Sequence, residues 1–199
     1  MADARTIATY DARAAEYATL LSLDKPDDTL QAFIDLIAPG GRVLDLGCGP
    51  GAASAHMRDA GLRPDPIDAS EGMIAIARAK FKLDARIATF DDIGCKDVYD
   101  GIWANFSLLH APREKLAGHI AALVAALRQG GVFHIGMKTG EETIRDAIDR
   151  YYTLVTVDTL EKLLSDAGLR LTFQKEGIEK GLAGTMDPYV IMRGEKSDG

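Results

Sequence analysis

The spacing of apolar residues changes once along the chain, after about the first forty residues. Before that point alanine, leucine and tyrosine recur at helical spacing, and the stretch DDTLQAFIDLIAPGG has Asp27 or Asp28 as a start signal and Pro39-Gly40 as a stop. From residue 42 onward, short apolar runs of strand length alternate with amphipathic runs of helix length. This alternation predicts an open parallel sheet with helices on both faces, preceded by a helical segment.

The alternating part predicts the elements in order. Strands are expected at residues 42–46, 67–68, 85–89, 99–106 and 131–137, and helices at 51–60, 71–79 and 112–128. Residues 156–167 predict a further helix that ends at Gly168. The apolar segments 169–175 and 189–192 then predict two strands that pair as an antiparallel hairpin at the edge of the sheet.

The second strand has two alternatives, because Pro64 and Pro66 stand two positions apart. Prolines at this spacing remove two N–H groups that face the same neighbour. Residues 63–66 are therefore either a short, poorly bonded strand or a loop that leads into residues 67–68. The pattern favours neither.

Composition narrows the classes of function. A chain of 199 residues with 47% hydrophobic residues is long enough for one domain with its own core, and its net charge of −7 disfavours a nucleic-acid partner. The one short basic cluster, at residues 78–82, is interpreted as a solvated helix end. The N-terminus lacks the pattern of a signal peptide and no apolar run approaches about 18 residues, so we expect a cytoplasmic protein without a membrane partner. Cys48 and Cys95 form neither a disulfide framework nor a metal-binding spacing, and no metal is expected.

The stretch VLDLGCGPG, residues 43–51, places a glycine-rich turn directly after the first predicted strand. Ligands of open α/β sheets bind beyond the carboxyl ends of the strands, and the following helix offers free N–H groups to an anion. Gly47-x-Gly49-x-x-Ala52 also fits the dinucleotide fingerprint, and Asp68 stands where its ribose-binding acid is expected. The turn alone therefore predicts a nucleoside-bearing ligand without choosing among such ligands.

Three further stretches narrow that choice. PIDASEGMIAIA follows the second strand, ATFDDI the third, and YDGIWANFSLLHAP contains the fourth. Together with VLDLGCGPG, the helical N-terminus and the terminal strand pair, they resemble the class I S-adenosylmethionine-dependent methyltransferases over nearly the whole chain. The resemblance implies a Rossmann-like α/β fold, whose seven-stranded sheet has the order 3-2-1-4-5-7-6 and an antiparallel last strand. It implies S-adenosylmethionine as the cofactor. The chain is expected to be a single domain, with a helical cover at 1–40, a cofactor-binding core at 41–137 and an acceptor-side part at 138–199.

The resemblance also implies roles for the acids that follow the first three strands. Asp45 contacts the methionine amino group of the cofactor, directly or through water, and Asp68 accepts hydrogen bonds from both ribose hydroxyls. One of Asp91 and Asp92 meets the adenine amino group. Each acid has a plainer alternative: Asp45 is a structural acid, Asp68 caps the next helix, and the later pair are turn residues.

The other implied cofactor contacts come from the turns and from the N-terminal helix. They are Gly47, Cys48, Gly49, Ala69, Met73, Asn105, Phe106, Tyr10 and Tyr17. Cys48 is interpreted as a small filler of the turn rather than as a nucleophile. Tyr10 and Tyr17 either belong to the core of the helical cover or place a phenol near the carboxylate of the cofactor.

The acceptor side gives fewer signals. His110 follows the fourth strand and is the best candidate for a general base, with packing at the start of the next helix as the alternative. Residues 138–156 are expected to form a lid over the acceptor. Within them Arg145, Arg150, Tyr151 and Tyr152 are candidates to meet an anionic or aromatic molecule, or the tyrosines simply anchor the lid.

The sequence therefore predicts methyl transfer to a small molecule. NFSL is not the Asn/Asp-Pro-Pro-aromatic run that similar enzymes use on amide or base nitrogens, which argues against those acceptors. Two other classes stay open: a nicotinamide-dependent oxidoreductase, although the chain has no Tyr-x-x-x-Lys, and a protein that binds the cofactor without catalysis. A monomer or a homodimer is expected.

Overall fold

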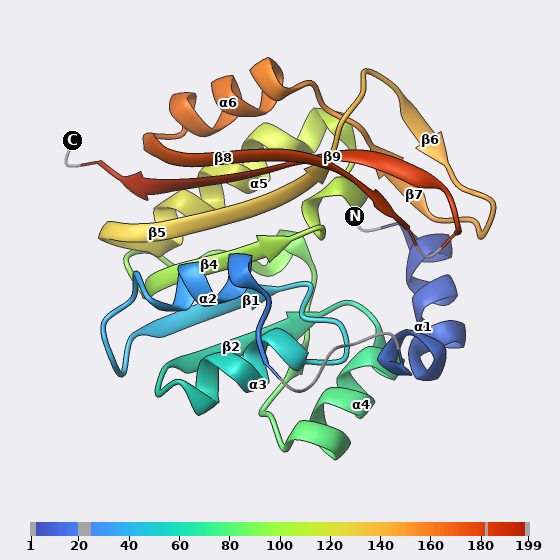
Figure 1. Cartoon of the computed structure of the whole chain (residues 1–199), viewed down its shortest axis with the longest axis horizontal. Helices are drawn as coiled ribbons and strands as arrows, with labels where there is room; N and C mark the ends of the chain where they lie inside the picture. The colour runs from blue at the N-terminus through green and yellow to red at the C-terminus, as the bar shows by residue number, and fades with distance from the viewer. Residues whose placement is uncertain (1–2, 20–24, 182, 198–199) are drawn as a thin grey trace.

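A seven-stranded sheet forms the centre of the molecule (Figure 1). The structure is a computed structural model and describes residues 3–19, 25–181 and 183–197. The strands of the sheet are β1 (Arg42–Leu46), β2 (Arg63–Asp68), β3 (Arg86–Ile87), β4 (Tyr99–Asn105), β5 (Leu127–Lys138), β8 (Leu169–Lys180) and β9 (Met186–Lys196). Their order is β3-β2-β1-β4-β5-β9-β8, in which β9 runs antiparallel to both of its neighbours. This confirms the predicted fold class; only the strand numbers differ, because a separate hairpin stands between β5 and β8.

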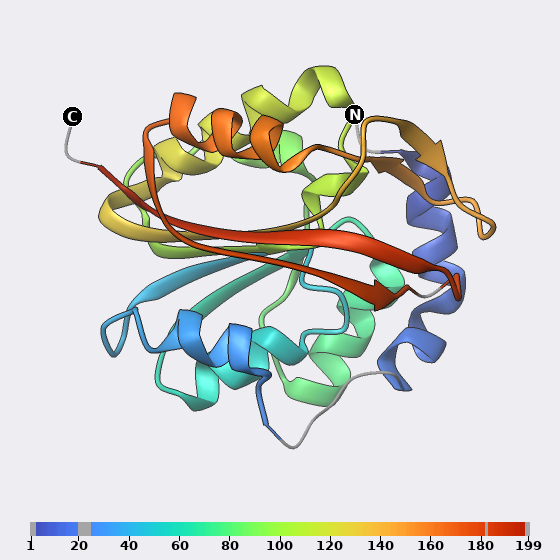
Figure 2. The same cartoon turned by 45° about the horizontal axis from the view of Figure 1, so that its top comes forward.

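Helices cover both faces of this sheet. They are α1 (Ala4–Thr19), α2 (Asp28–Ile34), α3 (Ala52–Asp59), α4 (Glu71–Phe81), α5 (Arg113–Ala126) and α6 (Val157–Asp166), with 3-10 turns η1 (Phe90–Asp92) and η2 (Leu108–His110). Figure 2 shows α5 and α6 on one face and α2, α3 and α4 on the other, with α1 at one end of the sheet. Asp27 begins α2, because its carboxylate accepts hydrogen bonds from the N–H groups of Thr29 and Leu30.

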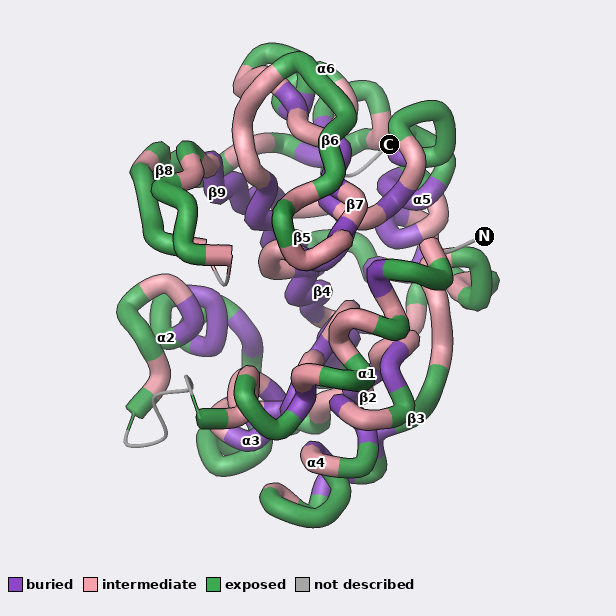
Figure 3. Tube along the Cα trace, turned by 90° about the vertical axis from the view of Figure 1, so that its right-hand side faces the viewer, coloured by how far each residue is buried: buried purple, intermediate pink, exposed green. Residues whose placement is uncertain are grey.

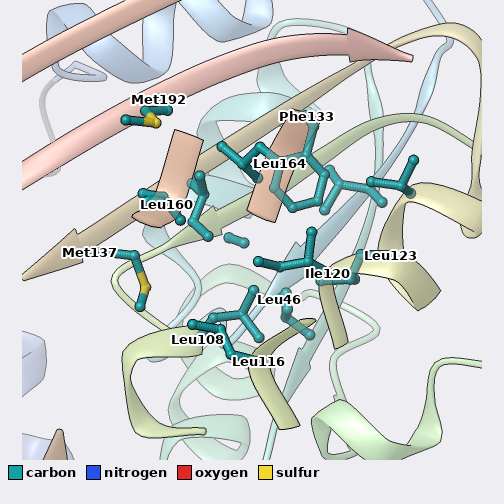
Figure 4. Packing of buried hydrophobic residues seen from close by; sticks show 14 of the residues in the cluster. Leu46, Leu108, Leu116, Ile120, Leu123, Phe133, Met137, Leu160, Leu164 and Met192 are labelled. Carbon is teal, nitrogen blue, oxygen red and sulfur yellow. The ribbon is translucent and has the colours of Figure 1, made fainter. Parts of the chain in front are cut away.

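The larger hydrophobic core lies between the sheet and the pair α5–α6 (Figure 4). Leu116 and Ile120 of α5 pack with Leu160 of α6 against strand residues such as Phe133, all at 2% exposure or less. The apolar stripe predicted for residues 112–128 is the face that α5 buries here. Burial on this scale is what holds the strand ends, and the turns that follow them, in fixed positions.

The structure answers the open question about the second strand. β2 pairs in parallel with the whole length of β1, through its residues from Arg63 to Ile67. The Arg63 N–H donates to Gly41 on the β1 side, so the N–H groups missing at Pro64 and Pro66 belong to the opposite, β3 side. β3 accordingly pairs with β2 only beyond the prolines and is two residues long, not the predicted five.

The last two strands are longer than predicted. β8 and β9 pair as predicted, but they continue to Lys180 and from Met186, beyond the end of the sheet, as a two-stranded ribbon (Figure 2). Side chains of β8 near the tip are exposed on both sides, and Ile178 is 67% exposed. No alternation of buried and polar positions marks this part, which is why its pairing was not predicted.

Residues 138–156 form a small hairpin of their own. β6 (Thr143–Arg145) and β7 (Tyr151–Thr153) pair in an antiparallel, two-stranded sheet beside α1. In Figure 3 this hairpin and α1 lie on the side of the molecule that faces the viewer, in front of the buried strands β4 and β5. Both segments therefore stand at the carboxyl end of the parallel strands.

Candidate active site

The glycine turn after β1 is shaped by its neighbours. Gly47 and Gly49 have φ angles of 71° and 53°, a region that suits glycine. The N–H groups of Gly47 and Cys48 both donate to the carbonyl of Ile67, which ties the turn to β2. A Cβ on Gly47 would lie 2.5 Å from Cβ of Ser107, so only glycine lets the turns after β1 and β4 approach this closely.

Asp68 fixes the next turn. One carboxylate oxygen accepts the Gly49 N–H at 2.9 Å, and the other accepts the Ser70 N–H at 2.8 Å. Ser70 itself is the N-cap of α4, because its hydroxyl accepts from the Met73 N–H. The alternative that Asp68 caps this helix is therefore wrong. Burial raises the pKa of Asp68, although its backbone hydrogen bonds act in the opposite direction.

A cavity of about 200 Å³ opens where these turns meet α1. Ten residues singled out in the sequence line it: Tyr10, Tyr17, Gly47, Gly49, Asp68, Ala69, Met73, Asn105, Phe106 and His110. Nine others complete the wall: Asp3, Thr6, Ile7, Leu46, Ser70, Ala88, Thr89, Phe90 and Ser107. Six of these nine lie within the motifs quoted from the sequence, and that position was an available signal. The other three, Asp3 and two residues of α1, carry no motif.

Four predicted cofactor residues do not line this cavity. Asp45 lies behind the turn at 2% exposure and accepts a hydrogen bond from Ser54 at 2.6 Å; burial raises its pKa to about 7. Cys48 is buried within the turn. Asp91 and Asp92 are exposed on η1, where Asp91 pairs with Lys115 and Asp92 accepts from Thr89. The predicted contacts of these four residues with the cofactor stay predictions.

The wall of the first cavity suits a nucleoside-bearing cofactor with a polar tail. Ser107 is 6% exposed, and its hydroxyl is buried without a hydrogen-bond partner among the described residues. A buried hydroxyl of this kind is stabilised when a ligand supplies its partner. Asp68 is an acceptor for hydroxyl groups, and Met73 adds an apolar surface at 2% exposure.

A second, wider cavity of about 1050 Å³ adjoins the first. The two share Tyr10, Tyr17, Asn105, Phe106 and His110. Beyond this shared wall, the second cavity is lined by the hairpin, by the β8–β9 ribbon and by the end of β5, including Tyr152, Tyr189 and the ion pair of Lys138 with Asp187. The described structure thus joins a narrow site and a broad one through five residues.

His110 has two hydrogen-bond partners at this junction. Its Nδ1 lies 2.6 Å from the carbonyl oxygen of Tyr151, and its Nε2 lies 2.9 Å from the hydroxyl of Tyr10. A carbonyl only accepts, so the proton of the neutral ring is on Nδ1, and Nε2 accepts from Tyr10. Burial lowers the pKa of His110 to about 4 and raises that of Tyr10 to about 12.

Arg150 holds the hairpin against α1. Its side chain donates to both Asp146, at 2.9 and 2.7 Å, and the Tyr10 hydroxyl, at 3.1 Å. It is 3% exposed, and it lines the second cavity together with Tyr152, as expected of a lid residue. Arg145 instead pairs with Asp3 of the N-terminal segment. Both arginines are thus already paired within the protein.

The side chain of Tyr151 does not line either cavity. Its ring lies beneath the guanidinium of Arg145, 5.8 Å from ring centroid to Cζ. The backbone of Tyr151 connects the site instead: its N–H donates to Thr6, and its carbonyl accepts from His110. The role predicted for Tyr151 as an acceptor contact stays a prediction.

The described residues hold neither a candidate metal site nor a candidate membrane-spanning helix. In the ranges given above, no group of three or more His, Cys, Asp or Glu side chains is placed to hold a metal ion. Over the same part of the chain, none of the helices has the length and hydrophobicity needed to cross a membrane.

The fold and the site together define a Rossmann-like protein with a cavity at the carboxyl ends of its parallel strands. A methyltransferase domain family matches residues 43–131. An uncharacterized methyltransferase of Staphylococcus carnosus is 29% identical over 147 residues, 66% of this chain and 71% of that protein. A malonyl-[acyl-carrier protein] O-methyltransferase of Enterobacter lignolyticus is 34% identical over 93 residues, 46% of this chain and 36% of that protein. The chain thus spans about a third of the second relative.

Solved structures agree with this fold. The 1,6-didemethyltoxoflavin-N1-methyltransferase of Burkholderia thailandensis, solved with bound 1,6-didemethyltoxoflavin and S-adenosylhomocysteine, superposes with a TM-score of 0.74 at 19% identity, covering 98% of this chain and 88% of that one. The family match over residues 43–131, the two relatives and the shared fold make the chain similar to S-adenosylmethionine-dependent methyltransferases, and they support S-adenosylmethionine as its cofactor. These likenesses favour S-adenosylmethionine over a nicotinamide cofactor.

Proposed function

We propose that this protein transfers a methyl group from S-adenosylmethionine, bound in the first cavity, to a small molecule bound in the second. One observation carries the proposal: the narrow and the wide cavity share a wall of five residues, so ligands in the two cavities would meet there. Methyl transfer requires the acceptor atom in line with the sulfonium and near contact distance, and such positioning contributes up to about 7–11 kcal/mol to lowering a barrier.

The chain's own residues supply the positioning of the cofactor. Asp68 offers its carboxylate to the ribose hydroxyls, while its bonds to Gly49 and Ser70 keep it in place. Ser107 offers its unpartnered hydroxyl to the polar tail. Asp45, directly behind the turn, balances the ammonium of the methionine part through water or after a small movement.

At the junction, Tyr10 and His110 are placed to move a proton. The bound sulfonium supplies an electrophilic methyl group and leaves as a thioether with the electron pair. The Tyr10 hydroxyl already donates a hydrogen bond to Nε2 of His110, so His110 does not take the acceptor's proton directly. That proton passes to the Tyr10 oxygen, while the phenolic proton of Tyr10 passes to Nε2 of His110. A base whose pKa is lowered to about 4 takes a proton efficiently only from an acidic group, so this arrangement favours an acidic phenol over an alcohol.

The second cavity favours an aromatic acceptor over a strongly anionic one. Tyr10, Phe106, Tyr152 and Tyr189 present rings on its wall, whereas Arg150 is committed to Asp146. The net charge of −7 also supports a small molecule rather than a nucleic acid. We further propose that the chain works as one domain, as a monomer or a homodimer, in the cytoplasm.

Two measurements test the proposal. In thermal unfolding, a ligand at about 100 times its dissociation constant stabilises the fold by about 2.7 kcal/mol. We expect this from S-adenosylmethionine and S-adenosylhomocysteine and not from NADH; stabilisation by NADH alone would contradict the proposal. Methyl-labelled cofactor is then incubated with a small-molecule cell extract. Label in a product supports an enzyme, and binding without product supports the non-catalytic alternative.

Variants of the relay separate chemistry from binding. Tyr10→Phe and His110→Gln are expected to lower methyl incorporation while retaining affinity for S-adenosylhomocysteine. Tyr189→Phe is the matched control, because Tyr189 lines the same cavity and packs edge-on against Phe106 without touching His110. An equal loss in all three variants would contradict a specific relay.

A further inference from the structure

His134 lies in the middle of β5 and is fully buried. Its ring stacks on Trp103 of β4, with 3.8 Å between the ring centroids and 13° between the ring planes. Arg193 of β9 is its register partner on the other side. Burial, aided by the charge of Arg193, holds the pKa of His134 well below its usual value. His134 is therefore a neutral imidazole with a single N–H.

The neighbours of the ring decide which nitrogen carries this proton. Nε2 lies 3.1 Å from Oδ1 of Asn105, while Nδ1 is buried with no hydrogen-bond partner among the described residues. A proton on Nδ1 would leave a buried donor without a partner. It would also place the lone pair of Nε2 against a lone pair of Oδ1, and the two would repel each other. The proton is therefore on Nε2, and His134 donates it to the Asn105 carbonyl.

This hydrogen bond orients the Asn105 amide. Its Oδ1 lies over Gly136, where an added Cβ would come within 2.6 Å of it. The amide is planar, with its oxygen and nitrogen on opposite sides of Cγ, so Nδ2 is turned away from His134. Asn105 lines both cavities, and within the described chain its Nδ2 makes no hydrogen bond.

We propose that His134 is a positioning residue, which holds the amide nitrogen of Asn105 as a hydrogen-bond donor at the junction of the two cavities, and that this donor selects an acceptor methylated on oxygen. The inference rests on the proposed methyl transfer. An oxygen offers the donor a lone pair beyond the one that attacks the methyl group. An amine nitrogen has one lone pair, and the attack uses it, so the donor would be left unpaired.

Two variants isolate this donor. Asn105→Asp keeps the shape of the side chain and the bond from His134 but replaces the donor with an acceptor. His134→Phe keeps a ring on Trp103 but removes the N–H that orients the amide. His56→Phe is the matched control, because His56 is on α3 and lines neither cavity.

The transfer assay uses methyl-labelled S-adenosylmethionine and a small-molecule cell extract. We expect Asn105→Asp and His134→Phe each to lower incorporation by about tenfold or more, with the double variant no worse than the single ones. In His134→Phe, whose changed residue lines neither cavity, affinity for S-adenosylhomocysteine should stay within about twofold of the wild type. Unchanged incorporation in His134→Phe overturns the positioning role. A product labelled on nitrogen overturns the oxygen assignment.

A spectroscopic test does not depend on turnover. In nitrogen-15 histidine spectra, we expect His134 to show one protonated ring nitrogen, Nε2, from about pH 6 to pH 8. The side-chain amide of Asn105 should shift in His134→Phe and not in His56→Phe. Protonation at Nδ1 overturns the proposal even where methyl transfer is active. An extract without labelled product refutes the proposed function, while these spectra still decide the orientation of the amide.

Discussion

The two cavities share a wall but are built in different ways. The first is shaped chiefly by backbone turns from residues 47–107: Asp68 is fixed by the N–H groups of Gly49 and Ser70, and Gly47 packs on Ser107. The second depends on side chains from distant segments. Arg150, for example, bonds to Tyr10 across 140 positions in the sequence. A site made of local turns leaves motifs in a sequence, whereas a site made of distant side-chain pairs does not.

This difference also predicts how the two cavities respond to mutation. Backbone hydrogen bonds persist when one side chain is shortened, so changes in the first cavity should act on ligand affinity. The second cavity relies on a buried ion pair, Arg150 with Asp146, whose side chains are 4% and 11% exposed. Removal of one partner leaves a buried charge uncompensated, so changes there should act on folding.

Arg150→Met should produce the largest effect. The substitution leaves the buried carboxylate of Asp146 without its partner and removes the contact between the hairpin and α1. It is expected to lower the free energy of unfolding by about 3–5 kcal/mol. Urea denaturation measures this change. The control is Arg5→Ala, which breaks an exposed pair with Asp149 between the same two segments and should cost about 0–1 kcal/mol. Similar losses in both variants would mean that burial does not distinguish the two contacts.

The same contrast explains how much the sequence could predict. The sheet order and the glycine turn were predictable because a change of period and a run of glycines are local signals. The hairpin at residues 143–153 was not predicted as strands, because its position depends on partners such as Asp3 and Thr6 of the N-terminal segment. No local pattern encodes a partner more than 140 positions away.

Local signals also have a limit within the predicted site. The motif after the third strand correctly marks the segment that lines the first cavity, but Thr89 and Phe90 line it, while Asp91 and Asp92 are exposed. The φ/ψ values of a short 3-10 turn set which side chains face inward, and composition does not encode them. His134 lies within a predicted strand and is buried, but its hydrogen bond to Asn105 depends on the register of β4 and β5, which the sequence does not encode.

Asp68→Ala tests the first cavity and should produce the second-largest effect. Loss of a charged acceptor for the ribose hydroxyls is expected to weaken S-adenosylhomocysteine binding by about 1.5–3 kcal/mol, measured by calorimetry. Asp65→Ala is the control on the same strand. Asp65 pairs with Arg42 and Arg86 away from the cavity, so its removal should lower the stability of the fold without lowering the affinity for the ligand. Equal affinity for S-adenosylhomocysteine in Asp68→Ala and the wild type would mean that Asp68 only fixes the turns and does not contact the ligand.

Asp45→Asn should have its smallest effect near pH 4, where the folded protein holds Asp45 protonated, and should change the pH dependence of stability above that pH. The folded-state pKa of Asp45 is raised from 3.8 to about 7, so the folded protein holds a proton that the unfolded chain releases above pH 4. Its contribution therefore makes wild-type stability fall as pH rises from 4 to 7, by at most about 1.4 kcal/mol per pH unit. Asp45→Asn should flatten this part of the profile, measured by urea denaturation at several pH values.

The same variant reports whether Asp45 meets the cofactor. If the ammonium of S-adenosylhomocysteine pairs with this carboxylate, binding near pH 6 favours its ionised form and releases up to about one proton. Calorimetry in two buffers of different ionisation enthalpy counts that proton. The wild type should release it and Asp45→Asn should not. Equal proton release in both proteins would leave Asp45 as a structural acid held by Ser54, and the first cavity would then owe its specificity to Asp68 and the backbone alone.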